Sequence, residues 1–279
     1  MSLSPCDALP TYFISHGGGP CFDMEWPSGN PFARLQASLS GFAAELGKQP
    51  RALLVVSAHW EESVPTVTAH PKPPLIYDYT GFPAHTYALR YDVPGSPELA
   101  ACVRHLLGLA GVPSAADATR GLDHGVFVPF RVMYPAADVP LVQLSLVTGY
   151  DPARHMAIGA ALAPLRNEGV LIVGSGMSFH NLERFFDGEG RDAGPFDAWL
   201  TRAVTGDPDQ RAALLERWLD APSARLAHPE EDHLAPLFVA AGAAPHERGV
   251  RNYADVVLGK HISGYRFGEA VASSPLSPS

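Results

Sequence analysis

Three largely apolar runs stand out in the chain, and each is followed closely by a histidine. The runs span residues 11–15, 53–56 and 170–173, and the histidines that follow them are His16, His59 and His180. Apolar residues without alternation are typical of strands that are buried on both faces of a sheet. Ligands of open α/β sheets bind beyond the carboxyl ends of the strands. We therefore expect the three strands to deliver their histidines to one crevice.

The rest of the pattern alternates between helical and extended segments. Apolar positions at helical spacing, with capping residues and terminating glycines, predict helices over residues 31–47, 97–110, 126–134, 152–167, 196–203, 208–219 and 230–243. Further strands are predicted over residues 64–69, 140–146, 252–258 and 262–267. This alternation predicts an α/β fold, a single domain in which helices cover both faces of a mostly parallel central sheet. The Ser- and Pro-rich residues 269–279 are predicted to form a flexible C-terminal tail.

A Pro- and aromatic-rich segment over residues 71–91 interrupts this regular alternation. It is too long and too apolar for a simple connection between two elements, so a lid or a wall of a pocket is one interpretation. Surface packing, or contact with another copy of the chain, explains the same composition, and the sequence leaves both interpretations open.

Composition narrows the class of protein without naming a substrate. The chain of 279 residues carries a net charge of −9, which argues against nucleic acid or an anionic membrane as a partner. No apolar run approaches the roughly 20 residues that span a bilayer, and the N-terminus lacks the pattern of a secretory signal. The cysteines Cys6, Cys21 and Cys102 are widely spaced, which fits free thiols in a reducing compartment. We therefore expect a cytoplasmic protein.

Histidine is the residue type with the clearest chemical pattern. Five of the 12 histidines attract attention by their positions at the ends of predicted elements: His16, His59, His124, His180 and His233. Neutral imidazole is a common metal ligand, so this group could hold Fe(II), Zn(II) or Mn(II). A single histidine is more often a structural residue, and for His124 a capping hydrogen bond at the start of its helix is an equal alternative. Six others are expected to be solvated: His70, His105, His155, His228, His246 and His261.

Familiar signatures of other enzyme classes are absent from the sequence. It contains no GxSxG elbow, no Walker loop and no GxGxxG after a strand. His16-Gly17-Gly18-Gly19 matches the HGGG oxyanion loop of esterases in its letters. Without a nucleophile elbow that match carries little weight.

Short motifs spread over most of the chain resemble one known family. They are His16-Gly17-Gly18-Gly19-Pro20, Val55-Val56-Ser57-Ala58-His59-Trp60, Tyr77-Asp78-Tyr79 with Gly81-Phe82-Pro83, Tyr91 with Pro94-Gly95-Ser96-Pro97, Gly121-Leu122-Asp123-His124-Gly125, Met133-Tyr134-Pro135 with residues 138–145, Gly174-Ser175-Gly176 with His180-Asn181-Leu182, His233 with Pro236-Leu237, and Gly264-Tyr265-Arg266-Phe267. In this order they resemble the class III extradiol ring-cleavage dioxygenases, of the DOPA-extradiol-dioxygenase type related to the catalytic subunit of protocatechuate 4,5-dioxygenase. The number of ordered matches carries the resemblance, rather than any single motif.

The resemblance implies a mononuclear non-haem metal centre. The metal is usually Fe(II), and Zn(II) is another ion that such a site could bind. By position, the implied metal ligands are His16, His59 and His233. A glutamate takes the third position in the protocatechuate branch, so Glu230 or Glu231 could contribute a carboxylate ligand here.

The resemblance also implies the reaction and its acid–base residues. Such an enzyme opens a catechol ring beside its two hydroxyls and inserts both atoms of O₂. His180 is the first candidate for the catalytic acid and base and His124 the second, with Asp123 as the residue that orients His124. The residues expected to close over the substrate ring are Tyr79, Phe82 and Tyr87. The catalytic domain would then span residues 1–268.

Two alternatives remain open at the level of the sequence. A zinc-dependent hydrolase could use the same histidines, with water on the metal as the nucleophile, and a non-enzymatic metal- or ligand-binding protein could share them. The expected partners are a small aromatic diol and O₂, with no nucleic acid and no membrane, and a homo-oligomer is left open. Candidates to bind a substrate carboxylate are Arg90, Arg120 and Arg184.

Overall fold

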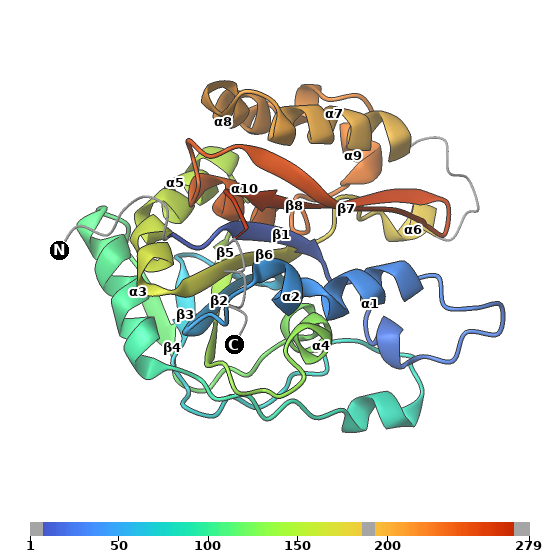
Figure 1. The fold of residues 1–279 in the computed structure, drawn as a ribbon, viewed down its shortest axis with the longest axis horizontal. Coiled ribbons are helices and arrows are strands. Elements are labelled where there is room, and N and C mark those ends of the chain that lie inside the picture. The colour runs from blue at the N-terminus through green and yellow to red at the C-terminus, as the bar shows by residue number, and fades with distance from the viewer. Residues whose placement is uncertain (1–7, 186–192, 271–279) are drawn as a thin grey trace, which may run out of the picture.

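The computed structural model describes residues 8–185 and 193–270, in which eight strands form one mixed sheet (Figure 1). The strands are β1 (Thr11–Ser15), β2 (Ala52–Glu62), β3 (Thr66–Thr68), β4 (Ala115–Asp117), β5 (Leu141–Val147), β6 (Val170–Gly176), β7 (Gly249–Val257) and β8 (Lys260–Phe267), in the order β4-β3-β5-β2-β6-β1-β8-β7 across the sheet. The predicted tail lies outside the described residues from residue 271 onward. Among the helices that are described, none is long and apolar enough to cross a membrane.

The four central strands, β5, β2, β6 and β1, run parallel to one another. β1, β5 and β6 are buried along their whole length, as expected for strands that helices cover on both faces. Antiparallel pairs occur where β3 joins β5 and where β8 joins β1 and β7. The prediction of an α/β fold with a mostly parallel sheet is therefore confirmed.

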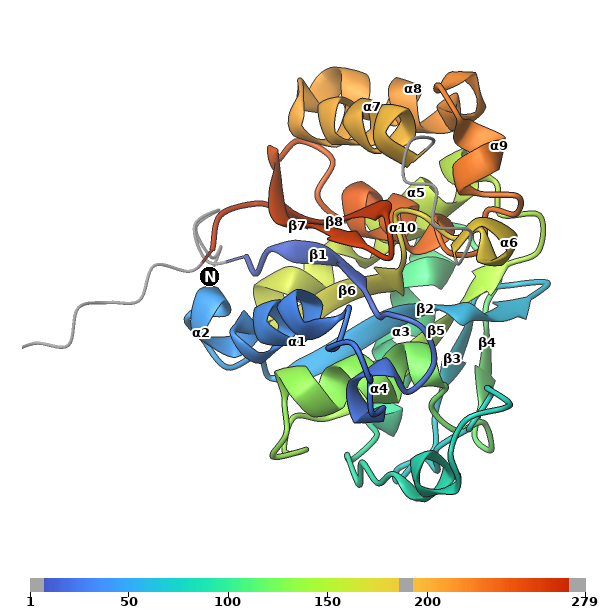
Figure 2. The ribbon, with the colours of Figure 1, turned by 90° about the vertical axis from the view of Figure 1, so that its right-hand side faces the viewer.

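Helices cover both faces of this sheet. They are α1 (Ala33–Ser40), α2 (Phe42–Leu46), α3 (Pro97–Leu109), α4 (His124–Met133), α5 (Pro152–Leu162), α6 (Leu182–Phe185), α7 (Ala193–Thr205), α8 (Pro208–Glu216), α9 (Ala224–Ala227) and α10 (Ala235–Gly242). Successive side chains of β1 face opposite layers: the Thr11 hydroxyl donates to Ala240 O of α10 at 2.7 Å, whereas the Tyr12 ring packs on Phe42 of α2. One layer thus contains α10, α5 and α3, and the other contains α1, α2 and α4 (Figures 1 and 2).

Two of the predicted helices differ from the sequence pattern in ways that affect the arrangement of the chain. The helix predicted over residues 31–47 is divided at Gly41 into α1 and α2. The helix predicted from residue 230 begins only at Ala235, because Pro236 is compatible with the first turn of a helix and not with its interior. His233 therefore lies in the connection that precedes α10, rather than on the helix itself.

β2 differs from the prediction in a way that matters for the site. The strand does not end at His59 but continues to Glu62, because Glu61 and Glu62 resume the pairing with β5. Between Val56 and Glu61 the register with β5 is interrupted. His59 therefore lies in an irregularity within the strand, a position at which bulges often redirect a side chain.

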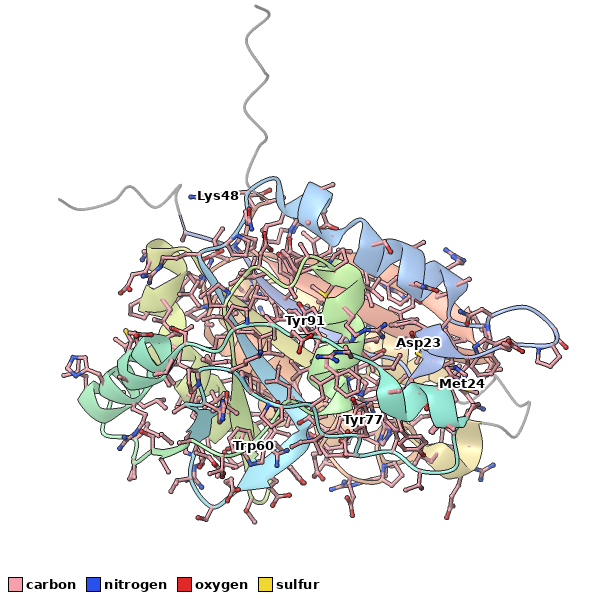
Figure 3. All side chains as sticks on the ribbon, turned by 90° about the horizontal axis from the view of Figure 1, so that it is seen from below. Asp23, Met24, Lys48, Trp60, Tyr77 and Tyr91 are labelled. Atoms are coloured by element: carbon pink, nitrogen blue, oxygen red, sulfur yellow. The ribbon has the colours of Figure 1, made fainter. Side chains whose placement is uncertain are left out.

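The aromatic-rich segment between β3 and α3 folds back on itself (Figure 3). The Tyr77 hydroxyl donates to Leu89 O and the Tyr79 hydroxyl donates to Thr86 O, both at 2.6 Å. The Tyr77 ring also lies 5.7 Å from the ring of Phe127 in α4. Figure 3 looks onto this segment, with Tyr77 and Tyr91 labelled along it. The segment is a packed wall against α4.

Candidate active site

A cavity of about 490 Å³ opens at the carboxyl ends of the parallel strands β1, β2 and β6. In Figure 2 these strands lie side by side in the middle of the sheet. All five histidines singled out in the sequence line the cavity, together with Asp78 and Asp232. The structure therefore brings together residues that span more than two hundred positions of the chain.

β1 and β2 place the first two histidines. Ser15, the last residue of β1, pairs with Gly176 at the end of β6, so His16 enters the cavity directly beyond the sheet. The irregularity in β2 turns His59 toward it. His16 Nε2 and His59 Nε2 lie 3.1 Å apart.

His233 reaches the same place because β6 carries a glycine beside it. A Cβ added to Gly176 would lie 2.2 Å from His233 O, so only glycine lets the two backbones approach this closely. Met177 N–H then donates to His233 O at 3.0 Å. The His233 ring lies 5.2 Å from the His16 ring and 4.8 Å from the His59 ring, measured between centroids.

His180 follows β6 in a connection that is tied to the segment before α10. Its backbone N–H donates to Ala227 O at 2.9 Å, and its ring stacks on the His233 ring with centroids 3.3 Å apart. His228 Nε2–H donates to Ser178 O at 3.1 Å, from a fully buried position. The expectation that His228 is solvated was wrong, because its ring fills a space beside Phe196.

His124 is the first residue of α4 and is held by Asp78. Asp78 Oδ1 accepts the backbone N–H of His124 at 2.9 Å and its Nδ1–H at 2.8 Å. The carboxylate thus caps the N-terminus of α4, where the helix dipole favours negative charge. Burial raises the pKa of Asp78, but the hydrogen bonds and charge of His124 outweigh burial, and the pKa is lowered. Asp78, and not the side chain of His124, therefore caps the N-terminus of α4.

Asp123 does not orient His124, contrary to the expectation from the sequence. Its buried carboxylate accepts from Ser57 Oγ at 2.7 Å, from Gln143 Nε2, and from Arg120 Nη2 at 3.4 Å. Burial raises the pKa of this carboxyl above its usual range. Asp123 therefore ties α4 to β2 and β5 from beneath the cavity.

The protonation pattern of His16 follows from a proline in α4. Pro129 has no N–H, so the carbonyl of Gly125, four residues earlier, has no partner within the helix. The Ser175 hydroxyl of β6 donates to this carbonyl. Because a hydroxyl has one proton and that of Ser175 is donated to Gly125 O, Ser175 Oγ can only accept from His16. It accepts the Nδ1–H of His16 at 3.2 Å. The Nε2 of His16, which faces the cavity, is left without a proton.

Burial keeps most of these histidines neutral, because the charged imidazolium would lose its hydration. The pKa of His59 falls to about 3 and that of His180 to about 4. The pKa values of His16 and His233 are also lowered well below the usual value, by burial first and by the neighbouring imidazoles second. At neutral pH these four rings therefore keep a lone pair that could bind a metal ion.

Two sets of close ligand atoms occur in the cavity. One comprises His16, His59 and His124 and the other His180, Asp232 and His233, with the atoms of each set within 4.8 Å of one another. Neither Asp78 nor Asp232 was predicted as a site residue. Asp232 is adjacent to His233 in the sequence, and Asp78 lies in one of the motifs quoted above. Neither position predicts which histidine ring donates a hydrogen bond to the carboxylate.

The carboxylates expected near the third ligand position point elsewhere. Glu231 pairs with Arg225 at 2.8 Å, and Glu230 is exposed outside the cavity lining. Of the arginines considered for a substrate carboxylate, Arg120 donates to His59 O at 3.3 Å and stacks on Trp60 behind the site, and Arg90 is exposed.

Aromatic residues form the outer wall of the cavity. Tyr79 and Phe82 line it, as their place in the aromatic-rich segment suggested. Tyr87 does not line it and packs on Tyr79 instead, with ring centroids 5.3 Å apart. Further lining residues that the sequence did not single out are Trp26, Phe32, Met177, Leu182 and Phe185. Trp26 and Met177 lie in connections, and Phe32 directly precedes α1. Leu182 and Phe185 belong to the short helix α6, which was not predicted.

Comparison with known proteins gives a consistent match over most of the chain. The family described as the catalytic LigB subunit of aromatic ring-opening dioxygenase matches residues 11–271. The chain is 42% identical over 239 residues to a 4,5-DOPA dioxygenase extradiol of Beta vulgaris, covering 84% of this chain and 86% of that protein. A protein of the same name in Escherichia coli strain K12 is 37% identical over 240 residues, covering 84% and 85%.

A further relative and a solved structure agree with these matches. The dioxygenase tasH of Hapsidospora irregularis is 38% identical over 290 residues, covering 96% of this chain and 86% of that protein. The crystal structure of an uncharacterized protein from Escherichia coli K12 superposes with a TM-score of 0.74 at 28% identity, covering 93% of this chain and 100% of that chain. This chain therefore belongs to the LigB family and is an extradiol aromatic ring-opening dioxygenase.

Proposed function

We propose that the chain opens a small catechol beside its two hydroxyls and inserts both atoms of O₂, with Fe(II) held by His16, His59 and His233. The observation that carries this is the 3.1 Å separation of His16 Nε2 and His59 Nε2. Two nitrogens that are each about 2.1 Å from one ion, roughly at right angles, are about 3.0 Å apart. A cation between them also satisfies the unprotonated Nε2 of His16 in a buried place.

The bound metal would bring the catechol and O₂ together and carry electron density between them. The chain's own residues must then move the catechol proton. His180 is the first candidate, because its neutral ring lies in the cavity against His233 and can accept a proton from a substrate hydroxyl. His124, at the other side of His59, is the second candidate.

The cavity wall supports an aromatic substrate with limited charge. Pockets of several hundred Å³ with mainly apolar walls suit small organic ligands, and Tyr79, Phe82 and Trp26 offer ring surfaces here. None of the lining residues that the structure describes is Lys or Arg. A carboxylate bonded directly to the substrate ring would lose its hydration on binding and would gain no ion pair with the residues that line the cavity. We therefore expect protocatechuate to be a poorer substrate than catechols without such a group.

The test is oxygen uptake by protein that has been reconstituted with Fe(II) without air. The panel comprises DOPA, which the names of the relatives suggest, plain catechol and protocatechuate. We expect one equivalent of O₂ consumed for each ring-opened product, with protocatechuate the slowest. No uptake with any catechol, despite bound iron, would contradict the proposal and shift weight to a zinc-dependent hydrolase.

His180→Ala tests the proposed role of His180 as the general acid and base. We expect this variant to retain the metal and to lose about 10²–10⁴-fold in kcat, the usual contribution of a general acid or base. Metal content by elemental analysis is measured beside oxygen uptake. Full activity in the variant would remove His180 from the proposed role.

A further inference from the structure

The carboxylate of Asp232 accepts a hydrogen bond from one histidine and lies near a second. Its Oδ2 accepts Nδ1–H from His233 at 2.7 Å. Its Oδ1 is buried and, within the described part of the chain, has no hydrogen-bond partner. Nδ1 of His180 lies 3.9 Å from this oxygen. A buried carboxylate with one unpartnered oxygen is costly unless a positive charge lies close by.

Asp78 has a similar position but a different set of contacts. Its Oδ1 accepts both the backbone N–H and the Nδ1–H of His124, at the N-terminus of α4. Its Oδ2 is 3.7 Å from His59 Nδ1. Two N–H groups and the positive end of a helix already compensate this carboxylate, so it does not require a cation in the cavity.

From this contrast we propose that the two carboxylates are positioning residues with divided roles. Asp232 fixes the Nδ1–H form of His233 and strengthens its Nε2 as a metal ligand, so Asp232 sets the affinity for the metal. Asp78 fixes His124 for proton transfer and has little effect on metal affinity, because its Oδ2 lies 3.7 Å from Nδ1 of the proposed ligand His59, beyond hydrogen-bond distance. This inference rests on the proposed function, because it takes His233 rather than His124 as the third ligand.

Either His124 or His233 could be the third metal ligand, because both lie close to His16 and His59. His124 lies with His16 and His59 in one set of close ligand atoms, and its ring is 4.0 Å from that of His59. If His124 were the ligand, Asp78 would be the carboxylate behind it. Residues that orient metal-bound histidines typically change metal affinity or activity by 10–100-fold when they are replaced. Loss of metal affinity on replacement of Asp232, which bonds His233, is therefore the result that assigns His233 as a ligand.

The experiment compares Asp232→Asn with Asp78→Asn by Zn(II) competition against a chelator, without catechol or O₂. Asparagine keeps an acceptor of the same shape and removes the charge. We expect Asp232→Asn to weaken Zn(II) binding by about 10–100-fold and Asp78→Asn to leave it within about twofold. With saturating Fe(II), Asp78→Asn is expected to lower kcat by about 10–100-fold with KM for the catechol nearly unchanged.

Asp92→Asn is the matched control, because it removes an exposed carboxylate that pairs with Arg90 and does not line the cavity. It should leave Zn(II) affinity and kcat unchanged. If Asp232→Asn does not fold, as judged by circular dichroism, Asp232→Glu keeps the charge but displaces the carboxylate and is expected to weaken Zn(II) in the same direction.

Two results would overturn the inference. Equal weakening of Zn(II) by both Asn variants would mean that Asp78 supports the metal as strongly as Asp232, through His124 or His59, so that the roles are not divided. Unchanged affinity in Asp232→Asn would mean that Asp232 has no part in holding the metal. Failure of the proposed function looks different: wild-type protein would then consume no O₂ with any catechol, whereas the difference in Zn(II) affinity would persist.

Discussion

At the scale of single residues, the site depends on which nitrogen of each ring carries the proton. His124 and His233 donate their Nδ1–H groups to carboxylates, whereas His16 donates to the hydroxyl of Ser175. A neutral acceptor polarises the ring less than a carboxylate does. Ser175 nevertheless fixes the His16 tautomer, because its own proton is committed to Gly125 O.

Replacement of Ser175 by alanine tests this role. In Ser175→Ala the Gly125 carbonyl and His16 Nδ1 both lose their partner, so we expect Zn(II) affinity to fall about 10–100-fold and unfolding free energy to fall by about 1–3 kcal/mol. Chelator competition and urea unfolding measure the two effects. Ser40→Ala, on the exposed face of α1, removes a hydroxyl that donates to Gln36 O of the same helix, and should change neither Zn(II) affinity nor unfolding free energy. An unchanged Zn(II) affinity in Ser175→Ala would show that the tautomer is held in another way.

At the scale of elements, helices are joined to the sheet by buried polar contacts as well as by apolar packing. His155 of α5 is fully buried, although its sequence neighbours suggested a solvated ring. Its Nδ1–H donates to Asp151 O at 2.8 Å, and its Nε2 accepts Val147 N–H from the end of β5 at 3.1 Å. Only the neutral ring can make both bonds. Burial accordingly lowers the pKa of His155.

A pH dependence of stability follows from the neutral state of His155. Because the folded-state pKa lies below the unfolded value of about 6.5, the unfolded chain binds more protons below that pH. The contribution of His155 is therefore complete above about pH 6.5 and declines as the pH falls from there. In urea unfolding, His155→Gln should be about 1–3 kcal/mol less stable than wild type at pH 7.5, with a smaller difference at pH 5.5.

The difference between variant and wild type isolates this ring, because the other buried histidines are present in both proteins. His105→Gln, at an exposed position of α3, should show no such change with pH. A constant difference between His155→Gln and wild type from pH 7.5 to 5.5 would contradict the assigned protonation state.

At the scale of the whole molecule, the cavity joins parts of the chain that are far apart. His59 lies in β2, and His16 and His180 follow β1 and β6. His124 begins α4, and His233 lies in the segment before α10. An unfolded chain cannot assemble such a set of ligands, so an ion that binds it stabilises the folded state by mass action. The net charge of −9 adds a general attraction for cations but no specificity.

Removal of the metal should therefore destabilise the entire fold. With free Zn(II) at about 100 times its dissociation constant, we expect unfolding free energy to rise by about 2.7 kcal/mol over chelator-treated protein. Urea unfolding with and without chelator measures this shift. His16→Ala, which lacks one proposed ligand, should respond much less. If the unfolding midpoint did not change on addition of Zn(II), the histidines would not form a metal site in the folded protein.

Much of the architecture could be predicted from local pattern. Apolar runs identified the central strands, and each run carried its histidine to the cavity edge, because consecutive parallel strands share one carboxyl end. The boundaries were less accurate where neighbouring elements decide them, as in β2, which continues past His59 because β5 pairs with it again. The burial of His155 and His228 was missed for a related reason, since each ring is covered by a distant element.

Local patterns along the chain were enough to predict the fold class, the family resemblance and the five histidines of the cavity, because periodicity and short motifs are local properties. Their partners depend on the folded chain: Asp78 bonds His124, Ser175 bonds His16, and Asp232 lies beside His180 with one oxygen that has no hydrogen-bond partner among the described residues. The contacts of Asp78 and Ser175 join positions 46 and 159 residues apart, and all three depend on strand register and on the path of irregular connections. No spacing along the chain encodes these distances, so the tautomers of the site appear only when the sheet is assembled.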